Sequence, residues 1–434
     1  MYPPSYPPVL SRQSTGSLIV ETTTDPAIGP LRPLPGIQIT VKERQATGER
    51  IVAQLVTNAN GQTPVIQLPA PPSELTEEPQ ATETPFAPYI IEAQGENVIP
   101  TQINGTQIFS TIRSIQPIRL TPSEAPIPVV ASRQNVEENI IIGPPTLYGD
   151  YPPKIPETSI KNTATPGFIV LPEVVVPEFI IVHAGSPNNN NASNYTVTYR
   201  DYIKNVASSE IYPTWPTETI RANVIAIISF TLNRVYTEWY RNKGKNFTIT
   251  NSTAFDHAFF FGRDIFDTIS EQVDQIFDIY CKRPGVEQPL LTQYCDGAKV
   301  SCPNWMTQWG SKSLGDEGLS YDEILRFYYG EDLTFPNAPV VAGVPESYPG
   351  TPLRLGDSGP AVRTIQEQLN RISNNYPLIP KVRTSGSFDE ATQESVRTFQ
   401  NIFHLTPDGI VGRDTWYKIS EIYVAVSRIA ELMP

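Results

Sequence analysis

The placement of proline limits what this chain can fold into more than any other feature. The sequence has 434 residues and 44 prolines, and about two thirds of the prolines lie before residue 180 between short apolar runs. Proline breaks helix interiors and cannot donate to the hydrogen-bond ladder of a central strand. We therefore expect the first 180 residues to be all-β with long loops, and helices only beyond them.

Short runs with period-two alternation predict about seven strands in this first part. They cover residues 16–21, 37–41, 50–57, 64–68, 89–93, 106–109 and 114–120. Seven strands are typical of a two-sheet sandwich. The order of strands and proline-rich turns resembles transthyretin-like and carboxypeptidase-regulatory-like modules, and this resemblance implies a fold without catalytic activity.

Apolar stripes with a 3.6-residue period predict helices farther along the chain. They cover residues 219–240, 265–280, 321–329, 361–372, 388–403 and 414–425. Pro216 and Thr217 are expected to start the first helix, with the Thr217 hydroxyl as its cap, and Ser320 is expected to cap the third. The three short helices at the end are sufficient to bury one modest core.

The predicted fold class is multidomain α+β: an N-terminal all-β transthyretin-like sandwich, a central mixed α/β catalytic domain and a C-terminal three-helix bundle. The expected parts are a tail (1–15), the sandwich prodomain (16–124), a proline-rich connector with processing sites (125–178), the catalytic domain (179–333), a linker (334–350) and the C-terminal domain (351–434).

Charge and hydropathy exclude several classes of function. The formal net charge is −13 and the pI about 4.9, which argues against nucleic acid as a partner. The sequence has no apolar stretch long enough for a membrane span. The first residues, Met-Tyr-Pro-Pro-Ser-Tyr-Pro-Pro, lack the basic and apolar regions of a standard secretory signal.

Few residues are suited to metal chemistry, and we expect no metal and no cofactor. The histidines are His183, His257 and His404, far apart in the sequence and read as solvated or structural. The cysteines are Cys281, Cys295 and Cys302, whose spacing differs from that of a zinc-binding Cys pair. Free thiols, or one disulfide such as Cys295–Cys302, are expected, and a missing secretory signal favours reduced thiols at synthesis.

Glu218 is the candidate proton donor. It stands at the start of the helix predicted over 219–240, and Tyr212 and Trp215 precede it. Cleavage of a glycosidic bond needs a carboxylic acid near the leaving oxygen, and aromatic walls raise a carboxyl pKa by desolvation. The helix dipole opposes this with a smaller effect. The alternative is that Glu218 only favours the helix start, and composition alone favours that alternative.

Two segments carry a family resemblance. Residues 216–223 (Pro-Thr-Glu-Thr-Ile-Arg-Ala-Asn) resemble the start of the catalytic helix in the stage II sporulation protein D family, and residues 308–315 and 318–330 are similar to its closing signature. The family consists of peptidoglycan lytic transglycosylases, and the resemblance implies that its single catalytic Glu is Glu218. The family's Ser-Ser-Gly-Gly turn is replaced by Gln-Tyr-Cys-Asp-Gly at 293–297, so we expect a remodelled groove.

The C-terminal part resembles the peptidoglycan-binding three-helix domain. The resemblance lies in residues 355–362, 365–369, 386–392, 396–400 and 408–416. Most of these positions are core or turn residues, so they indicate the fold better than they indicate ligand contacts.

The parts in this order resemble spore cortex-lytic enzyme precursors of clostridial-type spore formers. The resemblance implies a zymogen, made in sporulation, that acts on cortex peptidoglycan at the cortex/coat boundary of the spore. It also implies activation by a subtilisin-like germination protease. The cuts are expected between Pro126 and Leu171, with 132–135 and 167–170 as candidate sites.

The implied reaction uses one carboxyl group. Glu218 would protonate the oxygen between N-acetylmuramic acid and N-acetylglucosamine, then take a proton from the sugar's 6-hydroxyl as a 1,6-anhydro ring closes. Hydrolases need two carboxylates, and Asp256 as a second one keeps a hydrolytic muramidase open. The other alternative is a non-catalytic, peptidoglycan-anchored spore coat protein. The proposed substrate-binding residues are Tyr212, Asp256, Gln293, Tyr294, Gln308 and Trp309.

Overall fold

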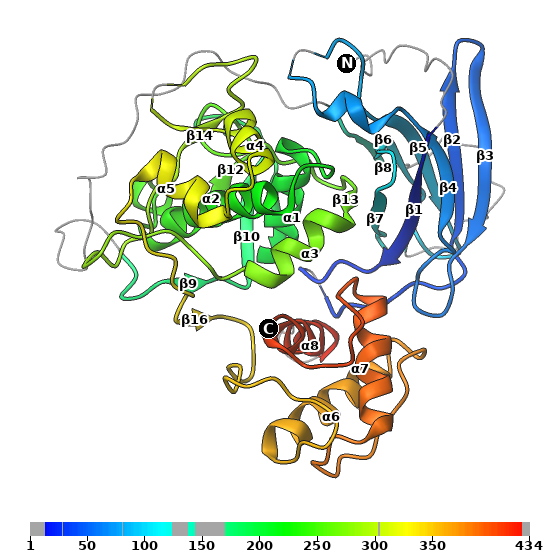
Figure 1. The fold of residues 1–434 in the computed structure, drawn as a ribbon. Helices are drawn as coiled ribbons and strands as arrows, with labels where there is room; N and C mark the ends of the chain where they lie inside the picture. The colour runs from blue at the N-terminus through cyan, green and yellow to red at the C-terminus, as the bar shows by residue number, and fades with distance from the viewer. Residues whose placement is uncertain are drawn as a thin grey trace.

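The computed structural model describes residues 14–27, 29–79, 81–123, 138–143, 170–302 and 304–427. The described chain is a mixed α+β protein with an N-terminal β-sandwich, a middle region of helices and short strands, and several C-terminal helices (Figure 1). The C-terminal helices lie beneath both other parts. The expected N-terminal tail up to residue 13 and candidate cut positions 132–135 and 167–169 lie outside the described residues.

The sandwich packs a five-stranded sheet, in the order β3-β2-β5-β6-β8, against a four-stranded sheet, in the order β13-β7-β1-β4. The strands of the first sheet are β2 (Gln38–Gln45), β3 (Gly48–Val56), β5 (Ala87–Gln94), β6 (Thr101–Ile108) and β8 (Glu138–Ile141), and those of the second are β1 (Ser14–Thr23), β4 (Ile66–Ala70), β7 (Arg113–Arg119) and β13 (Ile265–Phe266). Leu18, Val41 and Ile91 are fully buried between the sheets. The expected N-terminal sandwich is confirmed.

One strand of the sandwich comes from the middle region. β13 pairs antiparallel with β7, with Ile265 opposite Ile115. Gln116 Nε2 donates to the Gly262 carbonyl at 2.9 Å, beside this pairing. The sequence placed residue 265 inside a helix, which was wrong, because the helix begins two residues later. The sandwich and the middle region therefore share a sheet.

The middle region is built around one buried helix. Its elements are β9 (Val175–Val176), β10 (Phe179–His183), β11 (Asn194–Thr198), α1 (Tyr199–Glu210), α2 (Thr217–Tyr236), β12 (Ile249–Thr250), α3 (Asp267–Ile276), β14 (Tyr294–Cys295), β15 (Met306–Thr307), α4 (Gln308–Asp316) and α5 (Tyr321–Tyr329). The 3₁₀ helix η2 (Arg241–Lys243) follows α2, and the 3₁₀ helix η1 (Ser73–Thr76) lies in the sandwich part, between β4 and β5. α2 is buried on almost every face, as expected for a helix inside a core. The hydrophobic pattern of the sequence did not indicate α1 or α4.

The helix caps match the sequence at one position and differ at another. Ser320 caps α5 through a capping box, in which the Ser320 N–H donates to Glu323 Oε2 at 2.9 Å. The expected hydroxyl cap of α2 was wrong. Pro216 is the N-cap residue of α2 and makes no side-chain cap, and Thr217 is already the first helical residue.

The C-terminal part contains α6 (Pro360–Ile372), α7 (Glu390–Ile402) and α8 (Arg413–Ser427). Leu369, Phe399 and Trp416 are almost wholly buried among these helices. The segment before them is tied to the middle region, because β16 (Val340–Val341) pairs in parallel with β9.

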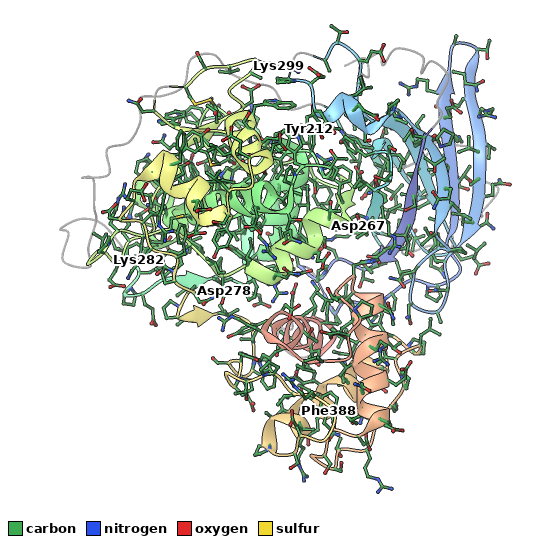
Figure 2. The ribbon with its side chains drawn as sticks, in the orientation of Figure 1. Tyr212, Asp267, Asp278, Lys282, Lys299 and Phe388 are labelled. Carbon is green, nitrogen blue, oxygen red and sulfur yellow. A yellow bond between two sulfur atoms is a disulfide. The ribbon has the colours of Figure 1, made fainter. Side chains whose placement is uncertain are left out.

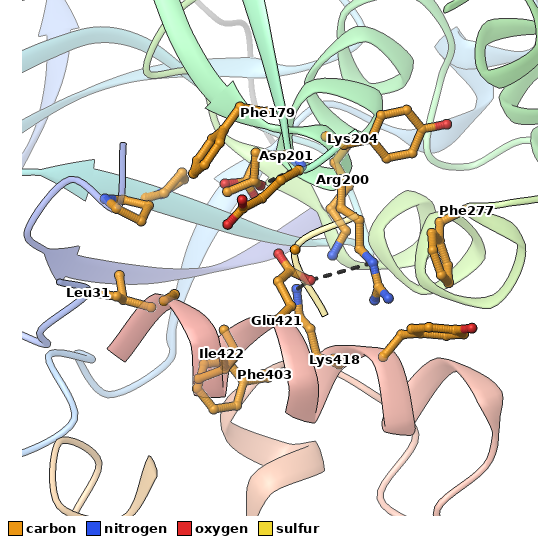
Figure 3. Close-up of a pocket in the computed structure, with 18 of the residues that line it drawn as sticks. Leu31, Phe179, Arg200, Asp201, Lys204, Phe277, Phe403, Lys418, Glu421 and Ile422 are labelled. Carbon is orange, nitrogen blue, oxygen red and sulfur yellow. Dashed lines mark hydrogen bonds and ion pairs between the residues drawn. The ribbon is translucent and has the colours of Figure 1, made fainter. Parts of the chain in front are cut away.

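Buried charges join α8 to the middle region. Asp274 on α3 is 1% exposed and binds Arg200 at 3.2 Å and Lys204 at 2.6 Å, both from α1. Lys418 of α8 lies 4.0 Å from the same carboxylate, and its neighbour Glu421 binds Arg200 at 3.5 Å. Figure 3 shows these cationic side chains and Glu421 around a cavity of about 220 Å³ between the three parts. Burial would raise the pKa of Asp274, but the charges of Lys204, Lys418 and Arg200 outweigh it and hold the pKa below its ordinary value.

The Asp274 cluster leads to a stability prediction. Asp274→Asn should lower the free energy of unfolding by about 3–5 kcal/mol, because it leaves buried cations without their anion. Because the pKa of Asp274 is lowered in the folded state, its contribution to the free energy of unfolding is present above the ordinary carboxyl pKa. That contribution is lost as pH falls through the lowered pKa. Urea unfolding at pH 7 and at pH 3 measures both effects, and the difference between wild type and variant should shrink at the lower pH.

Asp332→Asn is the matched control. Asp332 pairs with Arg283 but is 62% exposed, so its loss should change stability by less than about 1 kcal/mol. Equal urea midpoints for Asp274→Asn and wild type would contradict the role given to the cluster.

Candidate active site

Glu218 lies in the first turn of α2 in surroundings that stabilise its negative charge. Its side chain is 34% exposed, and Oε1 accepts from Arg221 Nη1 at 3.0 Å. Oε2 accepts from the backbone N–H of Tyr321 at 2.9 Å. The amino end of α2 favours an anion as well. These contacts differ from the desolvating walls that the sequence analysis expected around a carboxylic acid.

A second glutamate, Glu210, closes the preceding helix. α1 buries a stripe of side chains at helical spacing, formed by Tyr199, Tyr202, Ile203, Val206 and Ala207. Glu210 stands three residues after the last of these, so it continues the buried face. Pro213 lies just beyond the end of the helix, where a proline is common. α1 therefore turns a carboxyl group toward the interior of the middle region.

The Glu210 carboxyl group is half-buried and held by three donors. Oε1 accepts from the Ala258 backbone N–H at 2.7 Å. Oε2 accepts from the Tyr294 hydroxyl at 2.5 Å and, more distantly, from Gln308 Nε2 at 3.4 Å. Burial raises the pKa of Glu210 to about 7, and it outweighs these hydrogen bonds, which lower the pKa.

A carboxyl group with this pKa can give a proton and take one back near neutral pH. The position of Glu210 at the carboxyl end of α1 also favours a higher pKa, because that end of a helix disfavours a negative charge. The Tyr294 hydroxyl suits both states of Glu210, since a hydroxyl can donate to a carboxylate and accept from a carboxylic acid.

The structure places two predicted groove residues against Glu210 rather than Glu218. Tyr294, on β14, and Gln308, the first residue of α4, both donate to Glu210. Gln293 lines a cavity of about 590 Å³ together with Tyr294. Of the family-like closing segments, Gln308 contacts Glu210 and Tyr321 contacts Glu218.

Tyr212 and Trp309 lie in an aromatic cluster beside the site. Their ring centroids are 6.0 Å apart, and Trp215 lies 5.5 Å from Tyr212 and 5.0 Å from Trp309. Phe109, from the loop after β6, lies 6.0 Å from Tyr212. Figure 2 shows Tyr212 on the side of the middle region that faces the sandwich.

Asp256 lies in the wall of the 590 Å³ cavity, but its oxygens are already occupied. Its side chain is 0% exposed, and Oδ1 accepts from Arg234 Nε at 2.9 Å. Oδ2 accepts from the Tyr240 hydroxyl at 2.6 Å and from the Thr250 N–H and hydroxyl at 3.0 and 2.8 Å. This arrangement suits a structural anion better than a base that activates water.

The cysteines and histidines have structural surroundings. Cys295 and Cys302 form a disulfide next to Tyr294, and Cys281 is buried and free. His257 is buried and shares a hydrogen bond with Tyr202, whereas His404 binds Glu21 of the sandwich at 2.7 Å. Among the described residues, no three His, Cys, Asp or Glu side chains are grouped as metal ligands would be.

Comparison with known proteins supports the C-terminal expectation. Residues 358–419 match the family described as "Putative peptidoglycan binding domain", which supports peptidoglycan as a partner and a cell-wall-related protein. Among solved structures, the chain is similar to transthyretin from Sparus aurata, with 16% identity over 25% of this chain and 90% of that chain and a TM-score of 0.14. No curated protein matches the chain. Within the described ranges, no helix has the length and apolar character to span a membrane.

The raised pKa of Glu210 predicts an unusual effect of pH on stability. The folded state favours the neutral form of the Glu210 carboxyl group. The contribution of this group to folding stability is therefore present below the ordinary carboxyl pKa and is lost as pH rises through about 7. Glu210→Gln keeps the shape but stays neutral, so its Tm should exceed that of wild type at pH 8. The difference should shrink or vanish at pH 5.

Glu218→Gln is the control for this comparison. It removes an anion that Arg221 and the Tyr321 N–H stabilise, so it should not raise Tm at pH 8. A Glu210→Gln variant that is no more stable than wild type at pH 8 would contradict the burial argument.

Proposed function

We propose that this chain is the precursor of a peptidoglycan lytic transglycosylase in which Glu210 is the acid and then the base. The observation that carries the proposal is the half-buried Glu210 carboxyl, whose pKa of about 7 suits proton transfer in both directions. The match of residues 358–419 to a peptidoglycan-binding family supports the substrate class. The resemblance to sporulation protein D supports the reaction class, with the catalytic role moved from Glu218 to Glu210.

The proposed reaction needs no second carboxylate. Protonated Glu210 donates to the oxygen that joins N-acetylmuramic acid to N-acetylglucosamine, and the bond from the muramic C1 to that oxygen breaks. The muramic 6-hydroxyl then attacks C1 and gives its proton to the Glu210 carboxylate. The 1,6-anhydro ring closes, water is not consumed, and Glu210 returns to its protonated state.

Asp256 is the reason to prefer this route over hydrolysis. A hydrolase needs a second carboxylate to attack the sugar or to activate water. Asp256 was the candidate for that role, but its oxygens already accept from Arg234, Tyr240 and Thr250. A hydrolytic muramidase would have to use another group.

Contacts from the sandwich support an inactive precursor. Thr76, in η1, accepts from the Thr214 hydroxyl at 2.7 Å and, through its carbonyl, from Trp215 Nε1 at 3.1 Å. Glu77 pairs with Lys312 of α4. These contacts hold the segment around Thr76 over the loop between Glu210 and α2. We propose that this segment narrows access to the aromatic side of the site until the connector is cut.

The spore-related part of the proposal rests on the resemblance of the whole domain order to cortex-lytic precursors. On that basis the enzyme acts on cortex peptidoglycan at the cortex/coat boundary of the spore. A subtilisin-like germination protease would activate it. A peptidoglycan-anchored coat protein without activity remains the contrasting outcome, and the site variants described next distinguish the two.

Substitution of the two glutamates tests the assignment. Glu210→Gln, in the activated protein, should lower the rate of glycan cleavage by about 10²–10⁴-fold, because a general acid contributes that much. Glu218→Gln should stay within a few-fold of wild type. Mass spectrometry of digested cortex measures the anhydro products, which are lighter by one water than hydrolysis products.

Binding of both variants to insoluble peptidoglycan is the control, and it should equal wild type because α6–α8 are unchanged. Full activity of Glu210→Gln, or loss of activity only in Glu218→Gln, would refute the role of Glu210. Reducing ends in place of anhydro ends would show a hydrolase, and no products from wild type would favour the coat-protein alternative.

The precursor proposal predicts that a cut in the connector raises activity. A specific protease site can be introduced within residues 144–169, and cortex cleavage compared before and after the cut. We expect the cut to raise the rate of cortex cleavage at least tenfold. In Glu77→Gln the cut should raise this rate by less, because the uncut variant has already lost the ion pair with Lys312. An uncut chain that cleaves cortex as fast as the cut form would refute masking by the sandwich.

A further inference from the structure

A short stretch of the middle region, residues 262–266, is inserted into the sandwich, and the proposed proton transfer does not use it. It ends in β13, which lies beside β7 in the four-stranded sheet (Figure 1). At its other end, a Cβ atom on Gly262 would lie 2.9 Å from the Ile140 side chain of β8, so the backbone approaches that strand closely. We call residues 262–266 the inserted segment.

Direct contacts with β6 and the residues after it hold the inserted segment. The Gln107 N–H donates to Asp264 Oδ2 at 3.1 Å. The ring of Phe266 packs edge-on against that of Phe109, with the centroids 5.0 Å apart. The partners in these contacts lie outside residues 144–169, so a cut in that part of the connector leaves the contacts in place.

Ion pairs attach the sandwich to the other parts as well. The pairs are Arg119 with Asp201 of α1, Glu21 with His404 of the C-terminal part, and Glu77 with Lys312 of α4. A cut in the connector does not break these pairs either. The sandwich should therefore stay bound when the chain no longer joins it to the rest of the protein.

Asp264 is a carboxyl group buried at this contact without a full set of partners. Its side chain is 0% exposed. Oδ1 accepts no hydrogen bond from the described residues, and the Arg263 guanidinium group, which donates to Gln107 Oε1, lies 3.9 Å from it. A buried charge costs far more free energy than a buried neutral group. The neutral form of Asp264 therefore fits the docked sandwich better than the anion does.

Release of the sandwich would return Asp264 to water. Burial raises the pKa of Asp264 to about 6, although the charge of Arg263 and the Gln107 N–H lower it. In water the carboxyl group should regain its ordinary pKa of 3.8. The contribution of Asp264 to docking is therefore present below the ordinary carboxyl pKa and is lost as pH rises through about 6.

Other ionisable groups also face this contact. They are Asp201 and Glu21, paired with Arg119 and His404, and Asp267, which accepts from the Arg113 N–H at 3.4 Å. Burial raises the pKa of Asp267 and would raise those of Asp201 and Glu21, but the cationic partners outweigh it and hold these last two pKa values below the ordinary range. Histidine is a residue type that changes charge near neutral pH. These groups are the same in wild type and in an Asp264 variant, so a comparison of the two isolates the effect of Asp264.

We propose that the cut sandwich remains bound as a non-covalent subunit through the inserted segment, and that protonation of Asp264 strengthens this binding. The partner of the inserted segment is thus the protein's own sandwich after cleavage. The cut permits release, and pH determines how much of the sandwich leaves. Release also removes the contacts of Thr76 with Thr214 and Trp215. The inference goes beyond the proposed reaction and does not depend on which glutamate is the acid.

Sedimentation velocity of the cut protein tests the proposal. A specific protease site within residues 144–169 allows the full chain to be cut, and dilution then gives the Kd of the sandwich fragment. We expect one complex at micromolar concentration at pH 5, and a Kd that rises by about tenfold or more between pH 5 and pH 7.5. Asp264→Asn keeps the shape but stays neutral, so the ratio of its Kd values at the two pH values should be about tenfold smaller than in wild type.

Asp201→Asn is the matched control, because it removes the ion pair with Arg119 at the same contact and leaves Asp264 in place. It should raise the Kd at both pH values and keep the wild-type ratio. Separate fragments at pH 5 would overturn the proposal. An Asp264→Asn variant that has the wild-type ratio, or that forms no complex, would also overturn it, since a neutral side chain of the same shape should still dock.

Proton release is a second measurement that needs no variant. At pH 5 the docked Asp264 is protonated and the released Asp264 is not, so dissociation should release about one proton for each sandwich that leaves. Dilution calorimetry of the cut protein in two buffers with different ionisation enthalpies measures this number. Dissociation without proton release at pH 5 would contradict the role of Asp264.

Discussion

The chemistry of the candidate site depends on the balance between burial and hydrogen bonding at the Glu210 carboxyl group. Burial at the end of α1 disfavours the charge of Glu210, and the donors Ala258, Tyr294 and Gln308 favour it. Burial is the larger effect, and the resulting pKa of about 7 lets the group transfer a proton in either direction near neutrality. Glu218 stands at the opposite kind of helix end, where its carboxyl group accepts from Arg221 and from the backbone N–H of Tyr321.

The three parts of the chain are joined more closely than linkers between independent domains would allow. The sandwich takes β13 from the middle region, and the Asp274 cluster fixes α8 against α1 and α3. The part that matches the peptidoglycan-binding family is therefore oriented relative to Glu210. Thr76, from the sandwich, contacts Thr214 and Trp215 in the loop between Glu210 and α2, so the sandwich also packs against the segment that follows Glu210.

The sequence predicted the sandwich strands, the helices with clear stripes and the Ser320 cap, because alternation and capping are local signals. It missed α1, because the two tyrosines and the serines of α1 hide a stripe that packing alone confirms. Without α1, the sequence pattern pointed to Glu218 as the proton donor, whereas the residue proposed from the structure is Glu210. Glu210 continues the α1 stripe, and this placement follows only from the packing of α1. Tyr294 and Gln308 were predicted to line the groove, but their contact with Glu210 depends on long-range folding that one sequence does not show.

The pH dependence of cortex cleavage by the activated chain tests the central claim most directly. If Glu210 is the acid, kcat/KM falls at high pH with a midpoint near 7, in line with its pKa. Tyr294→Phe should move that midpoint upward, because the Tyr294 hydroxyl lowers the pKa of Glu210. A kcat/KM that keeps rising to pH 9, or a midpoint that is the same in Tyr294→Phe as in wild type, would contradict the account.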